Sequence, residues 1–222
     1  MRRFGLLALA LAVLAAVAAC GGSGKSAGPP DVLLHPDKLT AKAPQIFEAT
    51  FKTTKGDFTI EVHRSWARNG ADRFYNLVKS GFYDGDKFFR VVPNFVVQFG
   101  ISPDPEVSTQ WRSAAIPDDI VTVHNERGGV TFAAAGPNTR TTQVFINLGD
   151  NRALDNNGFA PFGAVTHGMD VVTKLYAGYG DEPTPHQAEM QLQGNAWLEK
   201  TYPKLDSIKT ARVTSESNPA LP

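Results

Sequence analysis

Short runs in which hydrophobic and polar residues alternate dominate the chain after about residue 45. Residues 46–62 alternate twice around Lys55-Gly56-Asp57, which predicts a β-hairpin. Further apolar runs are rich in Val and Phe and too short for buried helices, so they predict strands. These strands are expected at residues 87–92, 95–99, 129–134, 143–148, 161–165 and 208–213.

Helical signals occur in three other segments. From Ala71 onward, apolar residues recur at i, i+3, i+4 and i+7, which predicts a helix over residues 69–80 with Asn69 as its N-cap. A second short helix is expected at 168–177, and a partly helical stretch at 187–201. Many short strands with two or three helices predict a mainly β domain, either a closed barrel or a sandwich with helical plugs.

Composition narrows the class of protein. The chain has 222 residues, of which 42% are hydrophobic, and its 22 basic and 22 acidic side chains balance. This excludes a disordered chain and gives no reason to expect a nucleic-acid partner. A single cysteine, Cys20, excludes an intramolecular disulfide and a multi-cysteine zinc site. The five histidines are scattered, so neither a metal nor another cofactor is expected.

The first twenty residues follow a pattern of their own. Arg2 and Arg3 precede about 16 apolar or small residues, fewer than the roughly 20 that span a bilayer. A basic start, a short apolar stretch and small residues are typical of a secretory signal. Val17-Ala18-Ala19-Cys20 resembles the lipobox of bacterial lipoproteins, which implies cleavage before Cys20 and lipidation of its side chain. An ordinary signal peptide or an uncleaved anchor is the alternative.

The sequence thus divides into four parts. Residues 1–19 are expected to be a lipoprotein signal peptide, and 20–44 the lipidated cysteine with a flexible linker, because Gly, Ser and Pro dominate its start. Residues 45–213 show no strong shift in composition, which predicts one domain. Residues 214–222 are expected to form a tail.

The candidate chemistry lies in apolar segments that carry a few polar side chains. Arg90 and Gln98 lie eight residues apart with Pro93-Asn94 between them, so they could meet across a hairpin. An arginine in an aromatic patch usually has a planar acceptor to bind, although a surface salt bridge is the alternative here. The G-x-S-x-G and G-x-G-x-x-G patterns are absent from the sequence, which gives no support for acyl-transfer or dinucleotide chemistry.

Three motifs in these segments resemble the cyclophilins, the cyclosporin-binding class of peptidyl-prolyl cis–trans isomerases. Residues 88–98 fit F-x-R-x-x-P-x-F-x-x-Q, residues 135–146 are similar to A-G-P-N-T followed by Q-x-F-I, and residues 162–170 contain F-G-x-V and G-M-D. The resemblance covers roughly residues 45–213. It implies a closed eight-stranded barrel with two or three helices.

The resemblance also implies roles for ten residues. Arg90 matches the catalytic arginine, and Gln98 and Phe95 complete the catalytic set. The implied substrate-binding residues are Val96, Ala133, Ala134, Gln143, Phe145, Leu154 and Phe159. Ala153 stands where many eukaryotic members have tryptophan, and Phe159 where they have histidine. These departures predict weak cyclosporin binding with retained isomerase activity.

The sequence therefore predicts a peptidyl-prolyl isomerase that assists the folding of exported proteins. We expect it in the bacterial cell envelope, anchored to a membrane by its N-terminal lipid, with the domain outside the cytoplasm. The expected partners are proline-containing polypeptides, and the expected state is a monomer. Two other functions stay open, namely a binding module of the same fold and a membrane-tethered holdase.

Overall fold

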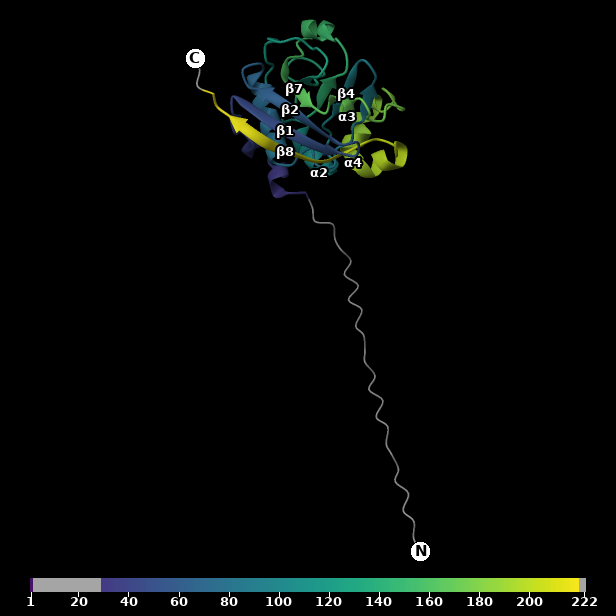
Figure 1. Cartoon of the computed structure of the whole chain (residues 1–222). Coiled ribbons are helices and arrows are strands. Elements are labelled where there is room, and N and C mark those ends of the chain that lie inside the picture. The colour runs from purple at the N-terminus through teal and green to yellow at the C-terminus, as the bar shows by residue number, and fades with distance from the viewer. Residues whose placement is uncertain (2–28, 220–222) are drawn as a thin grey trace.

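The first two strands form the hairpin that the alternation predicts. The computed structural model describes Met1 and residues 29–219 (Figure 1). Strand β1 (Ile46–Thr53) pairs antiparallel with β2 (Asp57–His63), and alternate side chains of both strands are buried. Phe51 and Phe58 face each other across the pair, with ring centroids 5.0 Å apart. One face of the hairpin therefore lines the core, and the other meets solvent.

Eight strands among the described residues form one antiparallel sheet in the order β3-β4-β6-β5-β7-β2-β1-β8. In Figure 1 the C-terminal strand β8 runs alongside β1, and these two strands pair antiparallel. Each short apolar run of the sequence contains a strand. Beyond the hairpin, the strands are β3 (Arg90–Val92), β4 (Val96–Phe99), β5 (Gly129–Phe132), β6 (Val144–Asn147), β7 (Pro161–His167) and β8 (Ile208–Ser217).

The expectation of a closed barrel is wrong, because the sheet is an open half-barrel between β3 and β8. Strands β3 and β8 do not pair with each other. An isolated bridge from Lys87 to Ser207 links the residues just before them, and the Gly85 N–H donates to the Ile208 carbonyl at 2.9 Å. Strand β3 is three residues long, and the Val91 N–H on it donates to the Gly180 carbonyl at 3.3 Å. A loop thus covers the edge that a closing strand would need.

Helix α1 (Arg68–Lys79) confirms the predicted buried face, since Ala71, Phe74, Tyr75 and Val78 are all buried. The predicted N-cap is wrong. The helix begins one residue earlier, and the carboxylate of Asp119 accepts hydrogen bonds from the N–H groups of Asn69 and Gly70 at 3.0 and 2.9 Å. A side chain fifty residues away along the sequence thus supplies the cap.

The remaining helices differ from the sequence prediction in extent. Helix α3 (Met169–Val172) is shorter than expected, whereas α4 (Gln187–Thr201) matches its predicted range and bends at Gly194. Helix α2 (Pro105–Trp111) was not predicted. Short 3-10 helices occur at η1 (Asp31–Leu34), η2 (Pro36–Lys38), η3 (Arg152–Asn157) and η4 (Thr184–His186).

Buried apolar side chains form two separate clusters. The main cluster fills the half-barrel and includes Phe51, Phe74 and Phe99. The second cluster is small and lies where α4 packs against the chain around β3 and β4. Its buried members are Phe89, Ile101, Met190, Leu198, Tyr202 and Leu205, with Tyr179 and Trp197 packed against them.

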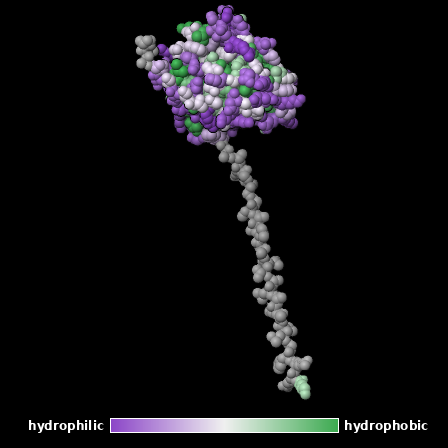
Figure 2. Space-filling model, in the orientation of Figure 1, coloured by the Kyte–Doolittle hydropathy of each residue, from purple (hydrophilic) through white to green (hydrophobic). Residues whose placement is uncertain are grey.

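Residues 29–44, directly before β1, pack against the domain, whereas the sequence predicts a flexible linker over residues 20–44; residues 20–28 lie outside the described part of the chain. Leu33 is buried, and its carbonyl accepts a hydrogen bond from the Trp111 indole N–H at 2.8 Å. At the other end β8 extends to Ser217, so the start of the expected tail is strand. The predicted signal peptide and Cys20 lie outside the described residues. Figure 2 shows a largely hydrophilic face with scattered hydrophobic residues.

Candidate active site

Arg90 and Gln98 face each other across the β3–β4 hairpin, as their spacing predicts. They are direct partners in the strand register, and Arg90 Nη1 donates to Gln98 Oε1 at 3.2 Å. The turn between them includes Asn94 at φ 61°, a left-handed conformation that asparagine tolerates better than most residues. The guanidinium carbon lies 5.3 Å from the Phe95 ring centroid, within the range of a cation–π contact.

A chain of side-chain amides continues from this pair. Gln98 Nε2 donates to Gln143 Oε1 at 2.9 Å, and Gln143 Nε2 donates to Gln187 Oε1 at 2.8 Å. Because each amide both accepts and donates, the direction of every hydrogen bond is fixed by the arginine, which can only donate. The network therefore holds Gln98 and Gln143 in one orientation beneath Arg90.

Apolar side chains surround a hollow of about 220 Å³ beside Arg90. The Phe145 and Phe159 rings meet edge to face, with centroids 5.7 Å apart at 73°. Of the ten residues that the sequence singles out, nine line this hollow, and Gln143 lies behind it in the amide chain. The nine are Arg90, Phe95, Val96, Gln98, Ala133, Ala134, Phe145, Leu154 and Phe159.

The structure adds three polar residues that sequence reasoning missed. Thr184 and Gln187 line the same hollow, and the Asp181 carboxylate lies 2.5 Å from Arg90 Nε. All three belong to the segment between α3 and the start of α4. In the sequence these residues lie in a region rich in Gly, Pro and acidic residues. Such a composition indicates a loop, but it does not show that the loop contacts Arg90.

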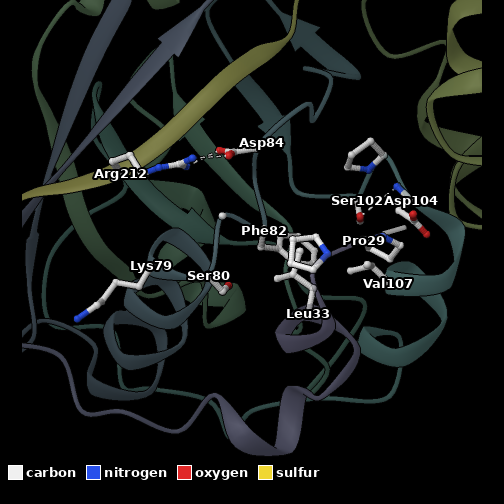
Figure 3. Close-up of a pocket in the computed structure, with 13 residues that line it drawn as sticks. Pro29, Leu33, Lys79, Ser80, Phe82, Asp84, Ser102, Asp104, Val107 and Arg212 are labelled. Atoms are coloured by element: carbon white, nitrogen blue, oxygen red, sulfur yellow. Dashed lines mark hydrogen bonds and ion pairs between the residues drawn. The ribbon is translucent and has the colours of Figure 1, made fainter. Parts of the chain in front are cut away.

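A larger hollow of about 480 Å³ lies elsewhere, between the N-terminal segment and the strand β8 (Figure 3). Its wall carries the Arg212–Asp84 ion pair, with both guanidinium–carboxylate distances at 2.7 Å, and apolar groups such as Leu33 and Val107. The charges here neutralise each other. The smaller hollow is the better candidate, because there an arginine with unfilled donor capacity borders an apolar socket.

The candidate site offers a positive donor at the edge of an apolar socket and no nucleophile. Among the described residues, no group of three His, Cys, Asp or Glu side chains is placed to hold a metal ion. Such a site can bind a ring-shaped apolar group and donate hydrogen bonds beside it. This suits a reaction that twists a bond without breaking one.

Comparisons with known proteins agree with this chemistry. Residues 48–194 match the family described as "Cyclophilin type peptidyl-prolyl cis-trans isomerase/CLD". A peptidyl-prolyl cis-trans isomerase of Acinetobacter baylyi is 36% identical over 130 residues, which are 56% of this chain and 69% of the relative. Peptidyl-prolyl cis-trans isomerase ppi1 of Schizosaccharomyces pombe is 35% identical over 130 residues, covering 56% of this chain and 81% of the relative.

The fold is also that of solved cyclophilins. A crystal structure of a Cryptosporidium parvum cyclophilin type isomerase superposes with a TM-score of 0.56 at 20% identity, covering 78% of this chain and 99% of that one. A second structure of that protein, determined in the presence of the dipeptide Ala-Pro, gives a TM-score of 0.55 at 21% identity and covers 76% and 99%. With the family match over most of the domain, the chain belongs to the cyclophilin-type peptidyl-prolyl cis–trans isomerases.

Proposed function

We propose that this isomerase turns X-Pro bonds in exported proteins and that a lipid on Cys20 tethers it to a membrane of the bacterial envelope. The observation that carries the catalytic half is the placement of Arg90 at the rim of the apolar hollow. The tethering half rests on the lipobox-like sequence that ends at Cys20. Proline-containing polypeptides are the proposed partners, by analogy with the Ala-Pro dipeptide of the Cryptosporidium relative.

The proposed mechanism uses no covalent step. Amide resonance sets a rotation barrier of about 18–20 kcal/mol, and the uncatalysed reaction takes tens to hundreds of seconds. A 10⁴-fold acceleration requires about 5–6 kcal/mol of preferential stabilisation of the twisted state. The proline ring would sit among Phe95, Phe145 and Leu154 while the preceding carbonyl swings. Val96 and Phe159 would complete the wall around the ring, and Ala133, Ala134 and Gln143 would contact the flanking peptide.

Arg90 would supply the preferential stabilisation. Twisting removes the conjugation between the prolyl nitrogen and the carbonyl, so the nitrogen becomes pyramidal and accepts a hydrogen bond. A guanidinium donor beside it therefore binds the twisted state more strongly than either planar state. Gln98 holds Nη1 and Asp181 lies at Nε, which leaves the other terminal nitrogen, Nη2, for the substrate.

Replacement of Arg90 tests this mechanism. We expect Arg90→Ala to lower kcat/KM for a short proline peptide by about 100-fold, because the donor is lost while the apolar socket stays. Arg212→Ala is the matched control, since it removes a half-exposed arginine on β8 that does not line the hollow beside Arg90. A near wild-type rate in Arg90→Ala would rule out the mechanism. Tight peptide binding with little turnover in the wild-type protein would instead favour a binding module.

The tether requires a separate experiment. No helix in the described part of the chain is long and apolar enough to cross a membrane. We expect mass spectrometry of the mature protein from a bacterial host to find an N-terminal Cys20 carrying acyl chains. Two or more chains would anchor the protein stably, whereas one would hold it weakly. A mature protein that starts elsewhere, or membrane association that survives Cys20→Ser, would contradict the proposal.

A further inference from the structure

The loop that follows α3 lies along β3 and reaches the catalytic arginine. The Val91 N–H on β3 donates to the Gly180 carbonyl at 3.3 Å, which places the next residue, Asp181, beside Arg90. Asp181 Oδ1 then lies 2.5 Å from Arg90 Nε. A second contact holds the carboxylate itself, because the Thr184 hydroxyl donates to the same oxygen at 2.9 Å. Asp181 is thus held in two ways, by the backbone hydrogen bond of the preceding residue, Gly180, and by the contact of its own side chain with Thr184.

The contact between Asp181 and Arg90 is made at a buried atom. Arg90 Nε is shielded from solvent, although the side chain as a whole is 23% exposed and that of Asp181 is 62% exposed. The Nε–H bond does not point straight at the carboxylate oxygen, so the contact is an ion pair rather than an aligned hydrogen bond. An ion pair at a shielded nitrogen is screened less by salt than a fully exposed one.

The role of Asp181 follows from which nitrogen atoms of the Arg90 guanidinium each neighbour contacts. Asp181 binds at Nε and Gln98 at Nη1, and within the described residues Nη2 makes no protein hydrogen bond. Nε–H and Nη1 lie on opposite edges of the planar guanidinium, so the two contacts fix the plane of the rigid fork and leave Nη2 for another acceptor. An aspartate that sequestered the arginine would instead bind the terminal nitrogens in bidentate fashion.

We propose that Asp181 is a positioning residue for prolyl isomerisation, which holds Arg90 by Nε so that its terminal nitrogens face the hollow. This inference rests on the proposed catalytic role of Arg90. The same loop leads into Thr184 and Gln187, which line the hollow. The second hydrophobic cluster supports the loop at both ends, through Tyr179 before it and Met190 after it. The C-terminal part of the chain is therefore a component of the active site.

Removal of the Asp181 carboxylate tests the proposal. We expect Asp181→Asn and Asp181→Ala to lower kcat for a proline peptide about 10-fold with little change in KM, because the apolar socket still binds the ring while the donor is misaimed. Asp181→Glu, which keeps a carboxylate, is expected to restore part of the rate. Glu182→Gln is the matched control, since it removes the same charge from the neighbouring position. The melting temperature of each variant shows that it is folded.

A double-mutant cycle shows whether Asp181 acts through the arginine. In the Arg90→Lys background, Asp181→Asn is expected to have little further effect, because lysine has no planar guanidinium whose orientation Asp181 could set. The NMR signal of Arg90 Nε–H gives a readout that does not depend on turnover, and we expect it to move in Asp181→Asn but not in Glu182→Gln.

The possible outcomes separate this inference from the proposed function. The positioning role is overturned if the Asp181 variants match Glu182→Gln in rate and leave the Arg90 Nε–H signal in place. It is also overturned if Asp181→Asn is faster than the wild type, because the contact would then be inhibitory. An inactive wild-type protein would overturn the proposed function as well. An active wild type with insensitive Asp181 variants would overturn only the positioning role.

Discussion

The two hydrophobic clusters differ in what they support. The main cluster fills the half-barrel with aromatic rings in mutual contact, such as Phe74 with Phe162 at 4.8 Å and with Tyr83 at 5.7 Å. The second cluster has six buried members and joins α4 to the chain around β3 and β4. Adjacent residues divide between them, since Phe88 belongs to the main cluster and Phe89 to the second.

This division places the candidate site between the two clusters. Arg90 directly follows Phe88 and Phe89, so its backbone is held from both sides of the strand. The main cluster determines where the hairpin lies, and the second determines where the loop with Asp181 lies. The fold and the orientation of the arginine thus depend on separate sets of contacts. Substitutions in each cluster should therefore have different consequences.

The largest expected effect comes from emptying the main cluster. Phe74→Ala removes a ring that packs on four other aromatic rings, and we expect it to lower the free energy of unfolding by about 3–5 kcal/mol. Leu198→Ala in the second cluster is expected to cost about 2 kcal/mol. Urea denaturation measures both changes.

The activity of the protein that remains folded distinguishes the two clusters. Leu198→Ala should lower kcat even well below its unfolding transition, because the loop that holds Arg90 loses its support. Phe74→Ala should lose activity only in proportion to the unfolded fraction. If the folded fraction of both variants keeps full activity, the proposed difference between the clusters is wrong, because the second cluster would then not be needed to hold Arg90 for the reaction.

An effect between those of Phe74→Ala and Leu198→Ala is expected at the bend in α4, beside the start of α2. Gly194 has φ 61° and ψ −153°, and an added Cβ would lie 2.2 Å from the Pro103 carbonyl oxygen. Only glycine adopts this conformation readily. We expect Gly194→Ala to cost roughly 2–3 kcal/mol in urea denaturation and to lower kcat. Gly136→Ala is the stability control, since a Cβ there meets nothing within 4 Å, and equal stability in both variants would contradict the prediction.

The sequence identified the part of the site that the main cluster supports. Alternation located the first hairpin, short apolar runs located the other strands, and the spacing of Arg90 and Gln98 predicted the pair that the register brings together. These features are local, because a hairpin needs only a turn and two matched strands. The composition did not distinguish an open sheet from a closed barrel. The sheet stays open because β3 is only three residues long and offers little backbone for pairing with β8.

The features that the sequence did not identify depend on distant partners. Asp119 caps α1 from fifty residues away, and Asp181 meets Arg90 from a loop without hydrophobic periodicity. Neither contact leaves a pattern in its own segment. Helix α2 is a different case, since Asp104 at the N-cap and Pro105 at the first position are recognised start signals. Its seven residues were too few to show the helical period.

The smallest of these effects is expected at Asp86, which is fully buried close to the boundary between the clusters. Within the described residues neither carboxyl oxygen has a hydrogen-bond partner, and the backbone N–H of Gly100 only partly opposes the rise of the pKa. Burial, with a smaller contribution from the charge of Asp84, raises the pKa of Asp86 well above its usual range. The protonated acid is therefore the form that the fold accommodates.

The direction of the pH dependence follows from this raised pKa. The folded protein holds the Asp86 proton more tightly than the unfolded chain, so its contribution to stability is complete below the ordinary pKa of aspartate. That contribution is lost as the pH rises through the folded-state pKa. Asp86→Asn cannot ionise, so we expect it to be more stable than the wild type by about 1–2 kcal/mol at pH 8, and by less at pH 4.

Urea denaturation at the two pH values measures this difference, with the exposed Asp37→Asn as the control that should change neither value. The position of Asp86 makes the result informative about both clusters. The carbonyl of the neighbouring Gly85 accepts a hydrogen bond from Asn195 Nδ2 on α4 at 2.9 Å. The backbone carbonyl of Asp86 accepts one from the Ile208 N–H on β8 at 2.9 Å. Ionisation would therefore strain the contact of α4 and β8 with the same segment. A pH-independent difference would show that the Asp86 carboxyl has the same pKa in the folded and the unfolded chain, as a solvated carboxyl would, and would remove Asp86 as a link between the clusters.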